Sequence, residues 1–311
     1  MKVGLIDVDG HNYPNLALMK LSAWHKAKGD TVEWWWSDLF QFDLVYMAKV
    51  FSDAYTKDAP EPMNAERVIK GGTGYAITLE NGVEVYHAER DLPLAPEIEH
   101  IYPDYSLYPE LTKETAFGFL TRGCPRGCAF CHVAGKEGRA SKKVANLSEF
   151  WSGQRNVTIM DPNILACKDR EDLLAQLVAS AAYVDFNQGL DIRLIDNDVT
   201  ALLGKMRVKC LHFAWDNPAE DLEPFFAKFS ERYARKDRRT KVVYVLTNFG
   251  STQEEDLHRI YTLRRLGFDP YVMIYNKQEA PRETRLLQRW CNNRVIFNTV
   301  PDFRNYDEKL G

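Results

Sequence analysis

The sequence predicts an α/β protein: an open, partial (β/α)6 barrel preceded by a small, truncated Rossmann-like α/β domain. From residue 115 onward, short apolar runs rich in β-branched and aromatic residues alternate with amphipathic stretches. This alternation is typical of parallel strands joined by helices. A shorter version of the pattern occupies the first 76 residues, and a chain of 311 residues is long enough for two cores.

The expected barrel spans residues 115–293, with each strand followed by a helix. Strands are predicted at 115–123, 156–161, 183–190, 210–216, 241–249 and 269–276. Helices are predicted at 169–182, 196–206, 219–235, 251–267 and 281–293. Asp196 or Asn197 and Ser251 or Thr252 are suitable helix caps, and Gly267 is a suitable stop. Right-handed crossovers then give one parallel sheet that curls on itself but is too short to close.

The amino-terminal domain is expected at residues 1–76. It has strands at 2–9, 31–36, 43–51 and 67–75, a helix at 15–29, and no helix between its second and third strands. The glycines of "GGTG" (71–74) indicate a tight turn, and a phosphate-binding loop is the less favoured interpretation. Residues 77–114, rich in prolines and acids, are expected to form an ordered connector, and 294–311 a carboxy-terminal tail.

Charge and hydropathy exclude two broad classes of protein. The net charge is −4, so the surface as a whole is not that of a nonspecific nucleic-acid binder. Two basic runs, 136–143 and 232–241, are interpreted as solvated faces, with phosphate contact as the alternative. No segment is long and apolar enough to span a membrane, and no secretion signal opens the chain. We therefore expect a cytoplasmic protein with no membrane partner.

Three of the six cysteines lie within eight residues, in "CPRGCAFC". Cys124, Cys128 and Cys131 follow the first predicted barrel strand, where the functional face of a parallel β/α fold is found. A structural zinc ion is usually bound by four protein ligands, often as two pairs, and the sequence has no second cysteine pair. A three-cysteine iron-sulfur cluster with one open iron remains, with zinc as the weaker alternative. The dispersed Cys167, Cys210 and Cys291 are interpreted as structural thiols.

The spacing C-x3-C-x2-C with Phe130 before the last cysteine closely resembles the signature of the radical S-adenosylmethionine (radical SAM) superfamily, and that family's core is a partial β/α barrel. The resemblance implies a 4Fe-4S cluster on Cys124, Cys128 and Cys131. It also implies reductive cleavage of S-adenosylmethionine (SAM) to a 5′-deoxyadenosyl radical that abstracts hydrogen from a substrate. An external flavodoxin or ferredoxin is implied as the electron donor.

The resemblance also suggests roles for residues at later strand ends. Phe130 is expected near the adenine, and Asp161 of "MDPN" at the methionine amino group, where the family more often has a glycine-glycine-glutamate segment. Gln188, Asp191 and Arg193 of "NQGLDIR" are expected to hold the rest of SAM, with an ion pair from Arg193 to Asp191 or Asp196 as the structural alternative for that arginine. Substrate-facing candidates at the last three strand ends are Trp215, Asp216, Thr247, Asn248, Tyr275 and Asn276.

The amino-terminal domain resembles a shortened cobalamin-binding domain of one radical SAM branch. The usual D-x-H-x-x-G arrangement is absent, although "DGHNYPN" offers His11, so bound cobalamin is not favoured and a packing or substrate-capture role is preferred. Trp24, Trp34, Trp35 and Trp36 are interpreted as core residues.

The expected function is thus a radical SAM enzyme, with a small-molecule substrate favoured. Three alternatives remain: a cobalamin-dependent methyltransferase, a nucleic-acid-modifying enzyme, and a noncatalytic iron-sulfur or zinc module.

Overall fold

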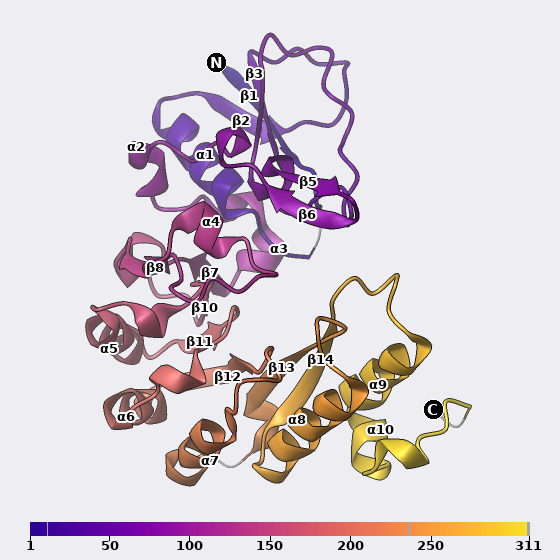
Figure 1. Ribbon diagram of the computed structural model, residues 1–311. Helices are drawn as coiled ribbons and strands as arrows, with labels where there is room; N and C mark the ends of the chain where they lie inside the picture. Colours follow the sequence, from indigo (N-terminus) through magenta and orange to yellow (C-terminus); the bar gives the residue numbers. More distant parts are fainter. Residues whose placement is uncertain (11, 236, 310–311) are drawn as a thin grey trace. The chain divides into compact units, whose positions relative to one another are not determined.

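The computed structural model describes residues 1–10, 12–235 and 237–309, and the chain divides into two compact units, Met1–Thr158 and Ile159–Gly311 (Figure 1). His11 lies outside the described residues. Within the described ranges, no helix has both the length and the apolar character that crossing a bilayer requires.

The first unit begins with a parallel sheet in the order β2-β1-β3-β4. Its strands are β1 (Lys2–Asp7), β2 (Thr31–Trp34), β3 (Leu44–Ala48) and β4 (Val68–Gly71). The helix α1 (Leu16–Ala27) joins β1 to β2, and Asn15 caps it by accepting a hydrogen bond from the Leu18 amide. All four predicted strands and the helix are confirmed, as is the missing helix between β2 and β3.

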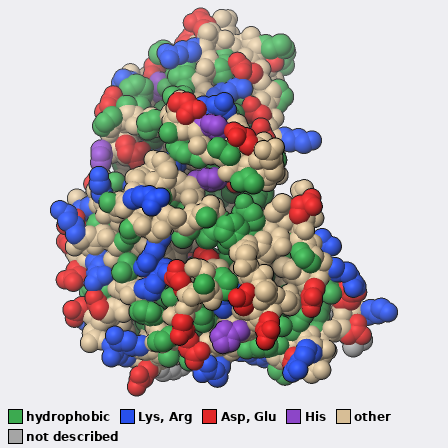
Figure 2. Space-filling model, viewed as in Figure 1, with side chains coloured by type: hydrophobic (Ala, Val, Ile, Leu, Met, Phe, Trp, Pro, Cys, Tyr) green, Lys and Arg blue, Asp and Glu red, His purple; other side chains and the backbone are tan. Residues whose placement is uncertain are grey.

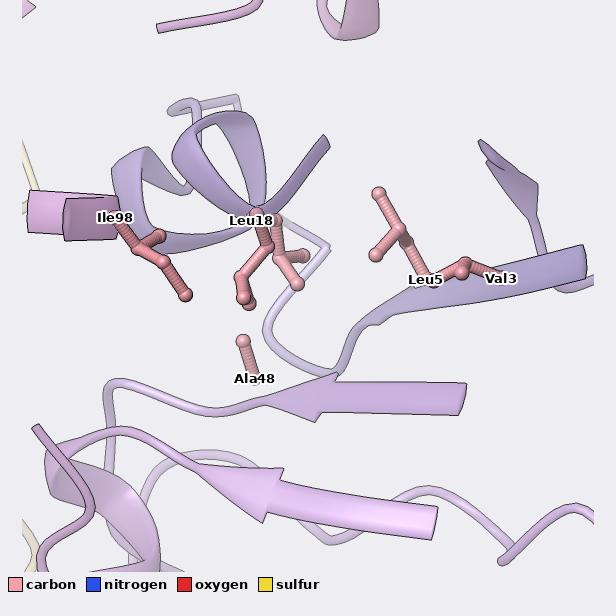
Figure 3. Close-up of a cluster of buried hydrophobic side chains, with 6 residues drawn as sticks. Val3, Leu5, Leu18, Ala48 and Ile98 are labelled. Carbon is pink, nitrogen blue, oxygen red and sulfur yellow. The ribbon is translucent and has the colours of Figure 1, made fainter. Parts of the chain in front are cut away.

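The core of this sheet lies between α1 and the strands. Val3 and Leu5 of β1 face Leu18 of α1, and Ala48 and Ile98 close the cluster (Figure 3). Three of the four predicted core tryptophans pack partly into the clusters of this unit, whereas Trp36 is 79% exposed. The prediction of a core position is therefore wrong for Trp36, because β2 ends two residues earlier, at Trp34.

The glycines after β4 are explained by close contact between backbones. Gly72 has φ +98°, and a Cβ there would lie 2.4 Å from the Lys49 carbonyl oxygen. A Cβ on Gly74 would lie 2.3 Å from the Phe51 carbonyl oxygen. Only glycine allows the two backbone segments to lie this close. The tight turn predicted at 71–74 therefore explains both glycines without a phosphate-binding role.

The connector is more regular than expected. It contains the hairpin β5 (Ile77–Glu80) and β6 (Val83–Tyr86), turned by Asn81 and Gly82. It also contains four short helices: η2 (Ala88–Arg90), α2 (Pro96–Glu99), η3 (Tyr105–Leu107) and α3 (Pro109–Thr112). The connector therefore packs as part of the first unit.

The second sheet has six parallel strands that neighbour one another in chain order, β7-β10-β11-β12-β13-β14. The strands are β7 (Thr115–Gly118), β10 (Asn156–Ile159), β11 (Tyr183–Phe186), β12 (Arg207–Ala214), β13 (Lys241–Thr247) and β14 (Asp269–Ile274). Each predicted barrel strand is thus present. The boundary between the two compact units falls inside β10.

Helices follow five of these strands. They are α5 (Arg170–Ser180), α6 (Asn197–Lys205), α7 (Glu223–Arg232), α8 (Gln253–Arg265) and α9 (Arg282–Asn292), with α10 (Arg294–Thr299) added in the tail. Asp196 and Thr252 are the caps of α6 and α8, as predicted. After β7 the connection to β10 is mostly a glycine-containing loop, and its helices α4 (Val133–Glu137) and η4 (Leu147–Glu149) are short.

In the second unit, the two faces of the sheet differ. Alternate residues of β12, β13 and β14, such as Phe213, Val243 and Val272, are fully buried. The aromatic rings of α7 and the neighbouring Phe268 pack on Phe213. On the other face, Tyr271 and Met273 are 42% and 45% exposed. Helices therefore cover one face of these strands and leave the other open within this unit.

Candidate metal-binding loop and strand-end residues

The cysteine loop is closed at its base by a short ladder. The strands β8 (Thr121–Arg122) and β9 (Lys142–Lys143) pair antiparallel, and the Leu120 carbonyl oxygen accepts a 2.8 Å hydrogen bond from the Val144 amide. The two ends of the segment 123–141 therefore meet directly after β7. This closure places all three cysteines on one tethered loop at the carboxyl end of β7.

Glycine and Glu137 fix the start of this loop. Gly123 has φ +89°, and a Cβ there would lie 2.2 Å from the Ala140 carbonyl oxygen. The Glu137 carboxylate accepts hydrogen bonds from the Gly123 amide at 2.9 Å and from the Arg122 guanidinium at 2.8 Å. The Cys124 amide donates to the Gly138 carbonyl oxygen at 3.1 Å. The backbone at Cys124 is thereby held by its own amide and by that of Gly123.

The three cysteines differ in exposure. Cys124 is half-buried, and Cys128 and Cys131 are exposed. A turn joins the last two, since the Cys131 amide donates to the Cys128 carbonyl oxygen at 3.0 Å. Gly127, with φ +59°, precedes this turn. Phe130 is partly buried beside Cys131.

The donor set suits an iron-sulfur cluster, because three accessible thiols on one loop are the ligands that such clusters use. Among the described residues, no group of three or more His, Cys, Asp or Glu side chains is already gathered to hold an ion.

Residues after Cys131 attach the loop to the β5–β6 hairpin. The His132 Nε2 atom lies 3.5 Å from the Glu84 carboxylate. Lys136 contacts Thr73 and lies 4.0 Å from Asp91, and burial lowers the pKa of its ammonium group. His132 is thus paired with a carboxylate.

In the second unit, Asp161 lies two residues past β10 and is 3% exposed. Gln188 lies two residues past β11 and is exposed. Both positions are carboxyl ends of neighbouring strands, as the sequence predicted.

Arg193 is held by two carboxylates. Its Nε atom lies 2.7 Å from Asp191 Oδ1, and its guanidinium also pairs with Glu220. Burial alone would lower the pKa of Arg193, but the hydrogen bonds that it donates to Asp191 and Glu220, and the charges of both carboxylates, outweigh burial and raise that pKa. The ion pair with Asp191 that the sequence offered as an alternative is present, whereas Asp196 pairs with Arg170.

Trp215 and Asp216 follow β12. Trp215 is 2% exposed, stacks on Phe226, and donates from its indole nitrogen to the Glu220 carbonyl oxygen at 2.8 Å. Asp216 is half-buried, and desolvation raises the pKa of its carboxyl group to about 6. Of this predicted pair, only Asp216 is partly exposed and has a pKa close to neutral, as a reactive group requires.

A buried arginine that the sequence analysis missed lies below these residues. Arg259 of α8 is 1% exposed and donates to the carbonyl oxygens of Trp215 at 2.6 Å, Asp216 at 3.0 Å and Leu246 at 3.0 Å. Its guanidinium also lies 2.5 Å from the carboxylate of Asp256, which is 3% exposed. Arg259 thereby ties the carboxyl ends of β12 and β13 to α8. The sequence signal was Asp256 three residues before Arg259 on the apolar side of a predicted helix.

The last two predicted substrate-facing groups lie side by side. The Asn248 side-chain amide donates to the Tyr275 carbonyl oxygen at 2.8 Å, and the Phe249 ring contacts the Tyr275 ring. Asn248 and Asn276 both have positive φ, at 60° and 44°. Thr247 is fully buried and bonds to the Met273 carbonyl oxygen, which is a packing role.

In the first unit, polar groups at the carboxyl ends of β1 and β3 form hydrogen bonds with other groups of the chain. The Asp9 carboxylate accepts hydrogen bonds from the amides of Val50 at 2.6 Å and Phe51 at 3.3 Å. Asp7 accepts a 2.7 Å hydrogen bond from the Tyr108 hydroxyl. These strand ends are where an α/β sheet of this order usually binds an anionic ligand, and here a carboxylate of the chain takes the amide donors.

Comparison with known proteins adds no family assignment. No protein-family model matches the chain, and no curated protein matches it at a significant level.

Proposed function

We propose that the protein is a radical SAM enzyme that uses Cys124, Cys128 and Cys131 to bind a 4Fe-4S cluster. The observation that carries the proposal is the tethered three-cysteine loop directly after the first strand of a parallel sheet whose six strands run in chain order. We take this sheet to form a partial β/α barrel, in which the carboxyl ends of the strands form the functional face. When bound, the cluster supplies the electron that cleaves SAM.

The residues proposed to hold SAM are Asp161, Gln188, Asp191 and Arg193, with Phe130 beside the adenine. Asp161, a buried carboxylate, is suited to the methionine amino group. Arg193 is suited to the methionine carboxylate. Its second partner, Glu220, has a side chain 45% exposed and can give way to a ligand, whereas the Asp191 side chain is 5% exposed and holds the guanidinium in place.

Asp216 is proposed as an acid or base near the substrate. Because its pKa is raised to about 6, the group can gain or lose a proton near neutral pH. Asn248 and Tyr275 would line the same end of the sheet.

Two alternatives lose support from specific contacts. Several cations of the run 232–241 already interact with groups of the same chain. Arg235 donates to two carbonyl oxygens, Arg239 pairs with Asp237, and Lys241 is buried. Acidic and basic side chains also alternate over the face drawn in Figure 2. A small-molecule substrate is therefore favoured over a nucleic acid. The Asp9 contacts in the first unit likewise favour a domain without cobalamin.

The proposal is tested by anaerobic reconstitution with iron and sulfide, followed by a dithionite reaction with SAM. We expect about four irons per chain and formation of 5′-deoxyadenosine. Cys128→Ala should lose both. Cys167→Ala, which changes a buried cysteine outside the loop, should keep both.

Zinc in place of iron, or iron without 5′-deoxyadenosine, would contradict the proposal. A variant Cys167→Ala that behaves like Cys128→Ala would show that the loss reflects general thiol damage instead of the loop.

A further inference from the structure

The open face of the sheet in the second unit carries a cluster of three reactive side chains that the proposed function does not use. Asp185 lies on β11, and Cys210 and His212 lie on β12. Because side chains two residues apart on a strand share a face, Cys210 and His212 point the same way. Asp185 is the direct partner of Cys210 in the ladder between the two strands.

An irregularity in that ladder creates the juxtaposition. Val184 pairs with Val208, but the next residue, Asp185, pairs with Cys210, so Lys209 is an extra residue in β12. Such a bulge redirects the side chains that follow it. Here it brings a carboxylate, a thiol and an imidazole together.

His212 is positioned by its neighbours. Its Nδ1 atom lies 3.4 Å from Asp185 Oδ1 and 3.1 Å from the Phe186 carbonyl oxygen. Its ring stacks on Tyr244 with the planes 5° apart and the centroids 5.6 Å apart. The Phe186 carbonyl oxygen accepts a hydrogen bond from Nδ1, the Asp185 carboxylate lies beside it as a charge partner, and the stacking fixes the ring.

The electrostatics favour a charged imidazole. Burial alone would lower the pKa of His212, but the neighbouring Asp185 and Cys210 side chains outweigh it and raise that pKa to about 10. The ring therefore stays protonated through the neutral range. A protonated imidazole beside a sulfur stabilises the thiolate, which is the nucleophilic form of cysteine.

The site is also accessible. Cys210 is half-buried, and the side chains of His212 and Asp185 are 14% and 21% exposed. The Cys210 sulfur also contacts the carbonyl oxygens of Leu211 at 3.7 Å and Arg239 at 3.9 Å. Contacts of that length oppose a thiolate only weakly. Buried Cys167 and Cys291, in contrast, are 2% and 3% exposed.

We propose that Asp185, His212 and Cys210 form a reactive-thiol site that attacks small soft electrophiles, including peroxides. With hydrogen peroxide as the oxidant, the Cys210 sulfur forms a bond to one peroxide oxygen and the oxygen-oxygen bond breaks. The departing hydroxide takes the proton of the His212 ring and leaves as water. Cys210 becomes a sulfenic acid, two-electron oxidised, and the peroxide is reduced.

The first test is a timed reaction of the full-length protein with iodoacetamide near neutral pH, with each cysteine read separately by peptide mass spectrometry. Cys210 should react faster than buried Cys167 and Cys291. In His212→Gln the Cys210 rate should fall by about tenfold or more, because the imidazolium is gone. Tyr244→Phe keeps the ring that stacks on His212 and should leave the rate unchanged. An equal Cys210 rate in the parent and His212→Gln would overturn the proposal.

A second test needs no variant. If a thiolate helps to keep His212 charged, alkylation of Cys210 should lower the His212 pKa, as followed by NMR of the ring. An unchanged His212 pKa would show that the histidine only links strands, and the proposal would fail. Neither test requires cluster or SAM, so its outcome is independent of the radical SAM proposal.

Discussion

Replacing Arg259 with methionine should destabilise the second unit strongly. Methionine keeps the length and the helix propensity of arginine but removes the charge. The variant leaves the Asp256 carboxylate, 3% exposed, without its cationic partner. It also removes the donor from the carbonyl oxygens of Trp215, Asp216 and Leu246. Breaking a buried pair on one side costs about 3–5 kcal/mol, and each lost hydrogen bond adds roughly 1 kcal/mol where water cannot replace it.

We therefore expect the free energy of unfolding to fall by about 4 kcal/mol or more. Urea unfolding followed by far-UV circular dichroism and by tryptophan fluorescence measures it, since Trp215 lies at the site. Arg265→Met on the same helix is the matched control. Its ion pair with Glu223 is exposed and should be worth at most about 1 kcal/mol.

A second variant separates the two contributions. Adding Asp256→Leu to Arg259→Met removes the stranded carboxylate and should recover part of the stability, while the unsatisfied carbonyl oxygens keep the rest of the loss. If Arg259→Met costs no more than Arg265→Met, the buried guanidinium does not hold the ends of β12 and β13 together.

Two further predictions concern the loop and the acid. Gly123→Ala should lower the iron content after reconstitution without changing the helical signal, because its Cβ would collide with the Ala140 carbonyl oxygen. The control is Gly138→Ala, which also has a positive φ but has open space around it and should keep more iron. Equal iron losses in the two variants would show that the close contact at Gly123 does not hold the cysteine loop in place. Asp216→Asn should stabilise the protein by roughly 1–3 kcal/mol at about pH 8 and have no effect at about pH 3. The sign follows because a carboxyl group whose pKa is raised on folding, here to about 6, opposes folding once it is ionised. Urea unfolding at both pH values measures the change in stability. A stability gain of the variant confined to the acid range would refute this prediction.

The strands of the second sheet were predictable because their sequences are short apolar runs rich in β-branched and aromatic residues. The runs expected at 156–161, 241–249 and 269–276 start at the first residue of β10, β13 and β14 and overrun their ends by only two residues. Continuous apolar runs of this kind have few other interpretations in an α/β chain.

The hairpin β5–β6 was missed although its signal is in the sequence. Asn81 and Gly82 both have positive φ, as a two-residue hairpin turn requires, and they lie between alternating residues. The prolines and acidic residues around it are more typical of an irregular connector, which is why the hairpin was not predicted.

Positions in the candidate site were predictable, but partners were not. The sequence placed Arg193 and Asp216 at strand ends, since strand ends follow from the strands themselves. It did not reveal that Glu220 shares Arg193, or that Arg259 lies under Asp216, because these contacts join residues separated by a whole strand or helix. The cluster of Asp185 and Cys210 depends on a one-residue bulge, which no periodicity shows.

The ladder that closes the cysteine loop has a consequence for how this chain could change. Arg122 and Lys142 face each other where the segment leaves and returns. A two-residue turn could join β8 to β9 and discard everything between them, while the sheet kept all of its strands. The cysteine loop is in this sense a detachable insertion, which related chains could lose, lengthen or exchange without rebuilding the protein that carries it.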